Sequence, residues 1–215
     1  EIGSGLVGSE MCIRDRFSDK ELTKAVSEVK LDRDTTVYAK WIEKTDLGFT
    51  DVADNSPFRA AIGWAVKEGI TNGTSATTFS PGNTCTTAQI LTFLWRANGS
   101  PNSNAACPAS DVAETSPFYK ALCWANEKDL MTKGSGSTPC TRAAAVTYLW
   151  KLAGSPKMSV NSSFTDVPAS ADFAQAVAWA VEQGVTNGVS ASEFAPDSTC
   201  TRGQIVTFLY RNLLD

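Results

Sequence analysis

The 215-residue chain is 42% hydrophobic and 20% charged, with a formal net charge of −4 and no histidine. No window reaches the roughly 20 consecutive apolar residues that a membrane-spanning helix requires, and the net negative charge argues against a nucleic-acid partner. Because histidine is absent and no pair of acidic residues stands apart from the repeats described below, we expect no enzymatic activity, no cofactor and no metal site.

Residues 1–16, EIGSGLVGSEMCIRDR, lack an initial methionine and the basic stretch and apolar core of a signal peptide. The segment GLVGSEMCIRD resembles the translated sequencing-adapter read-through that is found at the ends of metagenomic gene predictions. An ordinary disordered tail is the alternative interpretation, and both interpretations predict a segment without structure. We therefore expect residues 1–16 to take no part in the fold and the natural N-terminus to be missing.

Within residues 17–44, residues 35–41 follow a pattern of period two, which is typical of a half-buried β-strand. One side of this predicted strand consists of Thr35, Val37, Ala39 and Trp41. Val29 and Leu31 indicate a preceding strand, so we expect a small N-terminal β-hairpin, frayed or lying against the rest of the chain, since a lone hairpin is marginally stable in water. The stretch DTTVYAKW resembles the closing strand of the Listeria-Bacteroides repeat, a β-grasp-like module of bacterial surface proteins whose first strands are absent here. This resemblance implies an extracellular location.

The remaining chain carries one pattern three times, in repeat 1 (residues 49–101), repeat 2 (residues 108–156) and repeat 3 (residues 164–215). Each repeat has an aspartate thirteen positions before a tryptophan. A cysteine follows that tryptophan after twenty-one positions in repeats 1 and 3, and after sixteen in repeat 2. These markers are Asp51, Trp64 and Cys85, then Asp111, Trp124 and Cys140, and finally Asp166, Trp179 and Cys200. Because one repeat has too little apolar surface to fold well alone, we expect the three to share a core.

Each repeat is predicted to form a helix, a loop and a second helix. Apolar residues of the first helix in repeat 1 recur with helical spacing at Phe58, Ala61, Ile62, Ala65 and Val66. Ser56-Pro57 and Gly69 are expected to cap its two ends. The second helices are predicted to start after the N-caps Thr86, Thr141 and Thr201, with capping boxes completed by Gln89 and Gln204. Their apolar residues extend beyond one stripe, so we expect the second helices to pack on each other.

The motifs F-x-D-V, A-x-x-W-A, G-[IV]-T-N-G, F-x-P and T-R at a helix start resemble, in this order, the S-layer homology domain over residues 49–215. This resemblance implies a mainly α fold, in which three helix-loop-helix repeats form a pseudo-threefold cluster with a central helix bundle within one monomeric chain. It also implies a non-catalytic module that anchors a surface protein to the anionic, for example pyruvylated, secondary polysaccharide of a Gram-positive cell wall. A protein–protein interaction scaffold at the cell surface is the alternative. A wall hydrolase is disfavoured because no catalytic constellation is present.

Two arginines are the central candidates for polysaccharide binding. Arg142 and Arg202 follow the predicted N-caps, where the helix dipole disfavours a cation by ~0.3–1 kcal/mol and unpaired helix N–H groups favour an anion. A planar guanidinium beside such groups suits a carboxylate or a ketal-pyruvate group. The resemblance implies this role for the arginine of the T-R motif. The other candidate residues are the caps Thr141, Thr201 and Gln204, and the turn residues Asn72, Gly73, Asn187 and Gly188, which are expected to shape the rim of a groove.

The placement of the arginines also predicts how variants behave. If both are partly exposed and opposed by the helix dipole, replacing them with Gln should leave folding stability unchanged or slightly raised while weakening binding. Repeat 1 has Thr87 in place of the arginine, so at most two arginine-bearing sites remain, and restoring Arg at this position should strengthen binding. The alternative is that each arginine pairs with a nearby carboxylate. The repeated aspartates are expected to accept backbone N–H groups at the turn before the first helix.

Outside the tail, five cysteines remain: Cys85, Cys140 and Cys200 at one repeat position, and Cys107 and Cys123 in repeat 2 alone. An odd number cannot form a complete set of disulfides within one chain. Buried free thiols are the default interpretation for all five, and Cys107 with Cys123 is the pair most compatible with a disulfide. Without histidine or a C-x-x-C motif, zinc binding is not expected.

Overall fold

The computed structural model of the protein describes residues 11–17, 38–43, 47–160 and 164–213. The chain divides into two units, Glu1–Leu47 and Gly48–Asp215. In the first unit, strand β1 (Met11–Phe17) pairs antiparallel with strand β2 (Tyr38–Glu43). The register is interrupted between Ile13 and Asp15.

This two-stranded sheet differs from the expected N-terminal structure. β2 shares residues 38–41 with the strand predicted from the alternating pattern, whereas the predicted partner near Val29 lies outside the described residues. Its partner is β1, most of which belongs to the segment that was expected to have no structure. Ile13 and Phe17 are residue types that are enriched in strands, which gives this segment some propensity to pair with an extended partner.

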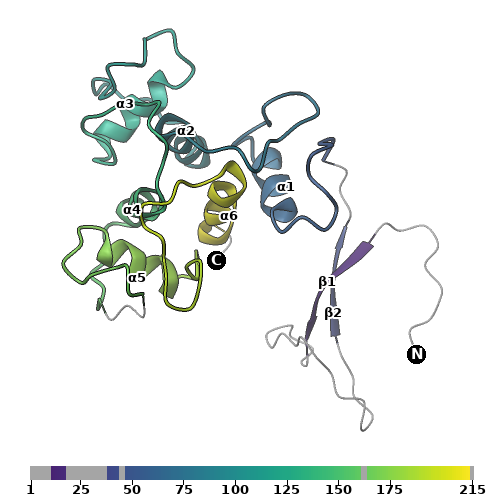
Figure 1. The fold of residues 1–215 in the computed structure, drawn as a ribbon. Helices are drawn as coiled ribbons and strands as arrows, with labels where there is room; N and C mark the ends of the chain where they lie inside the picture. The colour runs from purple at the N-terminus through teal and green to yellow at the C-terminus, as the bar shows by residue number, and fades with distance from the viewer. Residues whose placement is uncertain (1–10, 18–37, 44–46, 161–163, 214–215) are drawn as a thin grey trace. The chain divides into compact units, whose positions relative to one another are not determined.

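The second unit is helical, and the prediction of a mainly α fold is confirmed. Its described residues form α1 (Arg59–Lys67), α2 (Thr87–Ala97), α3 (Tyr119–Glu127), α4 (Arg142–Leu152), α5 (Ala174–Glu182) and α6 (Arg202–Leu213). Each repeat contributes two of these helices in chain order (Figure 1).

Local hydrogen bonds set the start of the second helix in each repeat. Thr86 Oγ1 accepts from Gln89 N at 3.3 Å, and Gln89 Oε1 accepts from Thr86 N at 2.9 Å, which is the predicted capping box. The first helices start differently from the prediction. Phe58, not Ser56, is the N-cap of α1, because Ser56 Oγ accepts from Phe58 N at 3.3 Å and holds a turn before the helix.

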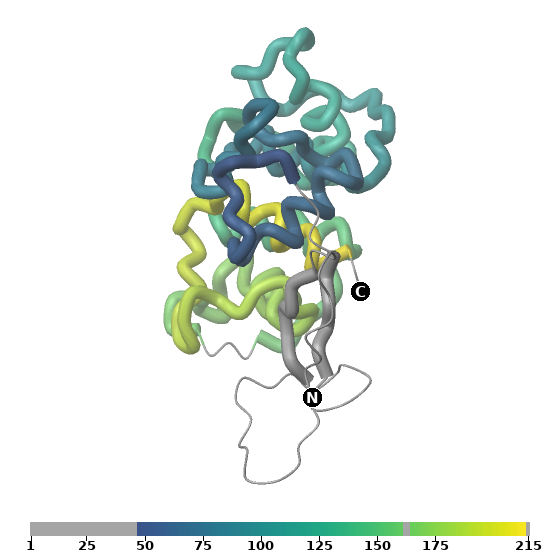
Figure 2. Tube along the Cα trace, turned by 90° about the vertical axis from the view of Figure 1, so that its right-hand side faces the viewer, coloured from purple at the N-terminus to yellow at the C-terminus, as the bar shows by residue number. Residues whose placement is uncertain are grey.

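The first helix of each repeat packs against the second helix of a different repeat. α3 contacts α2, α5 contacts α4, and α1 contacts α6, so repeat 3 closes back on repeat 1 (Figure 1). Figure 2 shows this closure from the side, with the C-terminal segment in yellow beside the blue segment of repeat 1. Each repeat therefore depends on a neighbour to cover the apolar side of its first helix.

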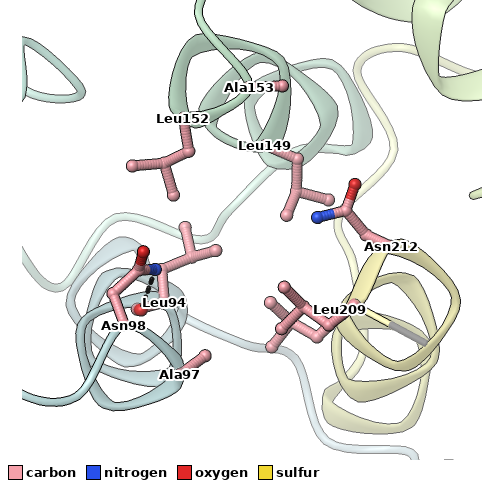
Figure 3. A pocket seen from close by; sticks show the side chains of 9 residues that line it. Leu94, Ala97, Asn98, Leu149, Leu152, Ala153, Leu209 and Asn212 are labelled. Atoms are coloured by element: carbon pink, nitrogen blue, oxygen red, sulfur yellow. Dashed lines mark hydrogen bonds between the residues drawn. The ribbon is translucent and has the colours of Figure 1, made fainter. Parts of the chain in front are cut away.

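The second helices α2, α4 and α6 lie at the centre of the second unit, as their broad apolar surfaces predict. Leu94, Leu149 and Leu209 point toward one another there, and each is at most 2% exposed (Figure 3). Towards their C-terminal ends the same helices border a small pocket, which is also lined by Asn98 and Asn212.

A closed ring of backbone hydrogen bonds joins the three repeats just before these helices. Cys85 N donates to Cys200 O, Cys200 N donates to Cys140 O, and Cys140 N donates to Cys85 O, each at 2.8 Å. The three thiols are at most 1% exposed. Burial raises the pKa of Cys85 to about 12 and that of Cys200 to about 11. No member of the ring can keep both of its hydrogen bonds if one repeat is removed.

Candidate functional site

The start of each second helix is covered by a loop from a neighbouring repeat. Arg142 N, the first N–H of α4, donates to Ser198 O at 2.9 Å, and Ala143 N donates to Pro196 O at 3.0 Å. The N–H of Ala144 donates to Oγ1 of the cap Thr141 at 3.2 Å. Equivalent bonds join α6 to Asn83 and Pro81, and α2 to Thr138 and Gly136. The helix N–H groups that were expected to be unpaired are occupied, so this premise for anion binding at the helix start is wrong.

The side chain of Arg142 lies between repeat 2 and repeat 3. Nε donates to Phe194 O at 2.8 Å, and Nη2 donates to Thr186 Oγ1 at 3.3 Å. The guanidinium carbon lies 4.9 Å from the ring centre of Phe194 and 5.6 Å from that of Phe208. Arg142 is only 4% exposed, so the expected partly exposed position is wrong. The arginine is a buried part of the junction between these repeats.

Arg202 makes the matching contacts between repeat 3 and repeat 1. Nε donates to Phe79 O at 3.0 Å, and Nη2 donates to Thr71 Oγ1 at 3.2 Å. The ring centres of Phe79 and Phe93 lie 4.8 Å and 5.5 Å from the guanidinium carbon. Burial lowers the pKa of both Arg142 and Arg202, but arginine remains charged because its usual pKa is so high. Two aromatic faces thus stabilise each buried cation.

Neither guanidinium forms an ion pair with a carboxylate in the described part of the chain. The repeated aspartates instead bind the loop segments that contact the arginines. Asp166 accepts from Phe194 N at 2.9 Å and from Ala195 N at 2.7 Å, and so holds the segment whose carbonyl binds Arg142. Burial raises the pKa of this carboxyl, but the backbone N–H donors and the charge of Arg142 together hold the pKa below its usual range.

Asp51 holds the corresponding segment beside Arg202. It accepts from Phe79 N at 2.8 Å and from Ser80 N at 2.6 Å, 28 and 29 positions along the chain. The expectation that the repeated aspartates accept backbone N–H groups is confirmed, but the donors lie in the loop before the second helix and not at the turn before the first. A carboxylate can accept hydrogen bonds from backbone N–H groups that lack a backbone acceptor, and here those N–H groups lie in the loop before the second helix.

Each guanidinium retains one edge for a further partner. An arginine has five N–H donors, of which Nε and one hydrogen of Nη2 bond within the described residues. Nη1 of Arg142 and of Arg202 has no hydrogen-bond partner there. Because no fully enclosed side-chain nitrogen among the described residues lacks a partner, Nη1 must reach solvent. A buried cation with one solvent-accessible nitrogen suits the binding of a small anionic group. The charge of that group would offset part of the free-energy cost of burying the cation.

The two Asn-Gly turns directly follow the threonines that bind the arginines. Gly188 has a φ of 81°, and a Cβ at this position would lie 2.6 Å from the Phe164 ring. Gly73 has a φ of 83° and would place a Cβ 2.6 Å from Thr78 O. Only glycine fits such positions, and the tight turns leave Asn72 and Asn187 exposed at the surface.

The other candidate residues serve the helix starts. Thr201 Oγ1 accepts from Gln204 N at 3.3 Å, and Gln204 Oε1 accepts from Thr201 N at 3.0 Å. Thr141 Oγ1 accepts from Ala144 N, as described above. These three residues therefore fix the backbone that carries Arg142 and Arg202, with their side-chain oxygens already engaged in capping.

The junction between repeats 1 and 2 lacks the partners of the arginine as well as the arginine itself. Thr87 Oγ1 donates to Thr138 O at 3.1 Å. By repeat position, Met131 replaces the threonine that binds Nη2, Gly134 replaces the stacked phenylalanine of the loop, and Tyr148 replaces the phenylalanine of the helix. Sequence reasoning noticed only Thr87. Comparing residues across the repeat boundary would have revealed the other three changes.

Arginine at position 87 is expected to destabilise the protein and not to strengthen ligand binding, which reverses the expectation from sequence. The buried Met131 offers no hydroxyl, so the guanidinium would displace it and lose hydration without gaining the two contacts of Arg142. We expect Thr87→Arg to lower the free energy of unfolding by about 2 kcal/mol in urea denaturation.

The control variant adds Met131→Thr and Tyr148→Phe to Thr87→Arg, and it should recover part of the lost stability. If Thr87→Arg alone unfolds at the same urea concentration as the parent and binds polymer more tightly, this description of the junction is wrong.

A family model for the S-layer homology domain matches residues 48–90 and 163–206, within repeats 1 and 3. A comparison with curated proteins found no match. S-layer homology domains mediate the anchoring of surface proteins to the cell wall, and these two segments of the chain are similar to that domain. The matched segments contain Thr71, Phe79 and Arg202, which meet at the junction of repeats 3 and 1.

Two further observations concern the part of the chain that the structure describes. None of its helices is long and apolar enough to cross a membrane. No group of three or more cysteine or acidic side chains in it is arranged to hold a metal ion.

Proposed function

We propose that this chain is a non-catalytic anchoring module at the cell surface, which binds an anionic secondary polysaccharide of a Gram-positive cell wall. The observation that carries this proposal is the pair of buried arginines, each with an Nη1 edge that no described residue occupies. A carboxylate or ketal-pyruvate group of the polymer would accept from Nη1 and form the direct ion pair that neither arginine makes within the described residues.

We also propose that the three repeats form a pseudo-threefold cluster within a monomeric chain. The cyclic hydrogen bonds of Cys85, Cys140 and Cys200 support this arrangement, as does the cyclic packing of the first helices on the second helices. Such a cluster has three junctions between repeats. Two of them contain an arginine and are the proposed anion sites, and the third, at Thr87, serves only to hold the repeats together.

The residues around each arginine hold its guanidinium in a fixed orientation. Phe194 and Phe208 stack on Arg142, and its Nε and Nη2 are held by the protein, so the direction of Nη1 is set before a ligand arrives. A donor that is already oriented loses little conformational entropy on binding. Asn187, which is exposed and follows Thr186 in the chain, would hydrogen-bond with sugar hydroxyls of the same polymer, and the exposed Asn72, which follows Thr71, would do the same.

Co-sedimentation with purified wall sacculi tests the proposed function. We expect the chain to pellet with intact sacculi and to remain in the supernatant once the secondary polymer has been stripped. Soluble polymer added to intact sacculi should release the bound chain. Sedimentation that is unaffected by stripping, or absent from both preparations, would overturn polysaccharide binding and favour a protein–protein scaffold.

A further inference from the structure

The linker between repeats 1 and 2 runs along α3 and brings one cysteine beside another. Ser103 Oγ donates to Cys123 O at 3.2 Å, and Asn126 Nδ2 donates to Ala106 O at 2.9 Å. These two bonds hold the linker on the helix directly before Cys107. Cys107 directly follows Ala106, and Asn126 lies one helical turn from Cys123, so the linker brings the two cysteines to the same side of α3; both are free thiols in this structure.

Only the second of the three repeats, together with the linker before it, carries this pair. At the position of Cys107, four residues before the repeated aspartate, the chain has Leu47 ahead of repeat 1 and Ser162 ahead of repeat 3, and at the position of Cys123 it has Gly63 and Ala178. Both cysteines are therefore present together or absent together. A cysteine that only filled space in α3 would not need a second cysteine in the linker.

We propose that Cys107 and Cys123 form a reversible disulfide when the protein meets a low-molecular-weight disulfide outside the cell. The half-buried Cys107 is the thiol that the small disulfide reaches first, since Cys123 is only 5% exposed. Its thiolate attacks one sulfur of the small disulfide and releases the other as a thiol. Cys123 then attacks Cys107 Sγ and releases the second small thiol.

The reaction is balanced without any further reagent. One sulfur–sulfur bond forms in the protein while the bond of the small disulfide breaks. The two protein thiols lose two protons and two electrons in total, and the two released thiols take them up. The extracellular setting in which such disulfides persist rests on the proposed function, but the chemistry can be tested on the purified chain.

The disulfide would fasten the linker to α3 at the one junction that lacks an arginine. It would close a loop between residues sixteen positions apart, which restricts the unfolded chain more than the folded one. The remaining described cysteines provide an internal control, because burial raises the pKa of Cys85, Cys140 and Cys200 and leaves them almost entirely as protonated thiols at neutral pH.

The test treats the folded full chain, carrying Cys12→Ser so that β1 has no thiol, with oxidised glutathione, followed by alkylation and mass spectrometry. We expect a mass loss of two hydrogens, no retained glutathione, and a single cross-linked peptide pair containing Cys107 and Cys123. Cys85, Cys140 and Cys200 should be alkylated only after denaturation. The thermal unfolding midpoint should rise on oxidation and return on reduction.

Matched variants complete the test. With Cys107→Ser, oxidation should change neither the mass nor the midpoint, and with Cys123→Ser it should leave glutathione attached to Cys107. A stable glutathione adduct on Cys107 in the chain that retains both cysteines, or both thiols free after prolonged treatment, would overturn the proposal. A cross-link that leaves the thermal midpoint unchanged would overturn the stabilising role of the disulfide.

Discussion

Replacing Arg142 and Arg202 together with glutamine is expected to abolish polymer binding and to lower the free energy of unfolding by about 4 kcal/mol, or about 2 kcal/mol for each arginine. Each replacement leaves a buried carbonyl, Phe194 O or Phe79 O, without its charged donor. It also opens space beside two aromatic rings. Equilibrium urea denaturation and sedimentation with sacculi measure the two effects separately.

The sign of the stability change follows from comparing three contributions. Removing a buried cation relieves its desolvation cost, which by itself favours the variant. Against this stand the lost charge-assisted hydrogen bond, worth roughly 1.5–3 kcal/mol, and the lost stacking on two rings, worth up to about 2 kcal/mol. The losses exceed the relief because the guanidinium is held at Nε and Nη2 and lies close to two aromatic rings. The expectation from sequence, that stability would not fall, assumed an exposed side chain.

Two control variants test whether the positive charge or the planar guanidinium of these arginines is responsible for the effects. Arg142→Lys combined with Arg202→Lys keeps both positive charges but loses the planar fork, so stability should fall about as much as with glutamine while some polymer binding remains. Thr87→Ala, at the junction without an arginine, should leave binding unchanged. Should the double glutamine variant bind polymer like the parent while folded, the two arginines are structural and the proposed site is wrong, although anchoring through other residues would still stand.

Deleting repeat 3, residues 164–215, is expected to abolish cooperative folding of what remains. α1 would lose α6, and α4 would lose both α5 and α6. The ring of backbone hydrogen bonds would also open, because Cys85 N donates to Cys200 O and Cys200 N donates to Cys140 O. Since the surviving helices cannot bury their apolar faces elsewhere, we expect no sharp thermal transition in circular dichroism.

Deleting residues 1–47 instead provides the matched control for this truncation. These residues form a separate unit, so the shortened chain should unfold at the same temperature as the parent and with equal cooperativity. A chain without repeat 3 that melted as sharply as the parent, at the same temperature, would show that repeats 1 and 2 do not depend on a shared core.

The sequence by itself determined the features that depend on neighbouring residues. The apolar spacing of the first helices and the Thr-x-x-Gln caps of α2 and α6 act within one or two helical turns, so they could be read directly from the chain. Gly69 also ends α1 with the expected left-handed conformation, at a φ of 68°. The repeat spacing also predicted three pairs of helices, and the described residues form six helices in that order.

Only the tertiary structure decided the surroundings of the arginines. Arg142 bonds to residues 44 and 52 positions away, and Arg202 bonds to residues 123 and 131 positions away. Each arginine belongs to one repeat, but its partners belong to the next, so a pattern read within one repeat could not contain them. The same holds for the helix N–H groups, which the sequence left open for an anion and which the loops of neighbouring repeats occupy. The sequence predicted two exposed charges opposed by the helix dipole, whereas in the structure both arginines are buried, hydrogen-bonded and close to aromatic rings. Desolvation and hydrogen bonding depend on which chain segments meet in space, so the sequence pattern could not reveal them.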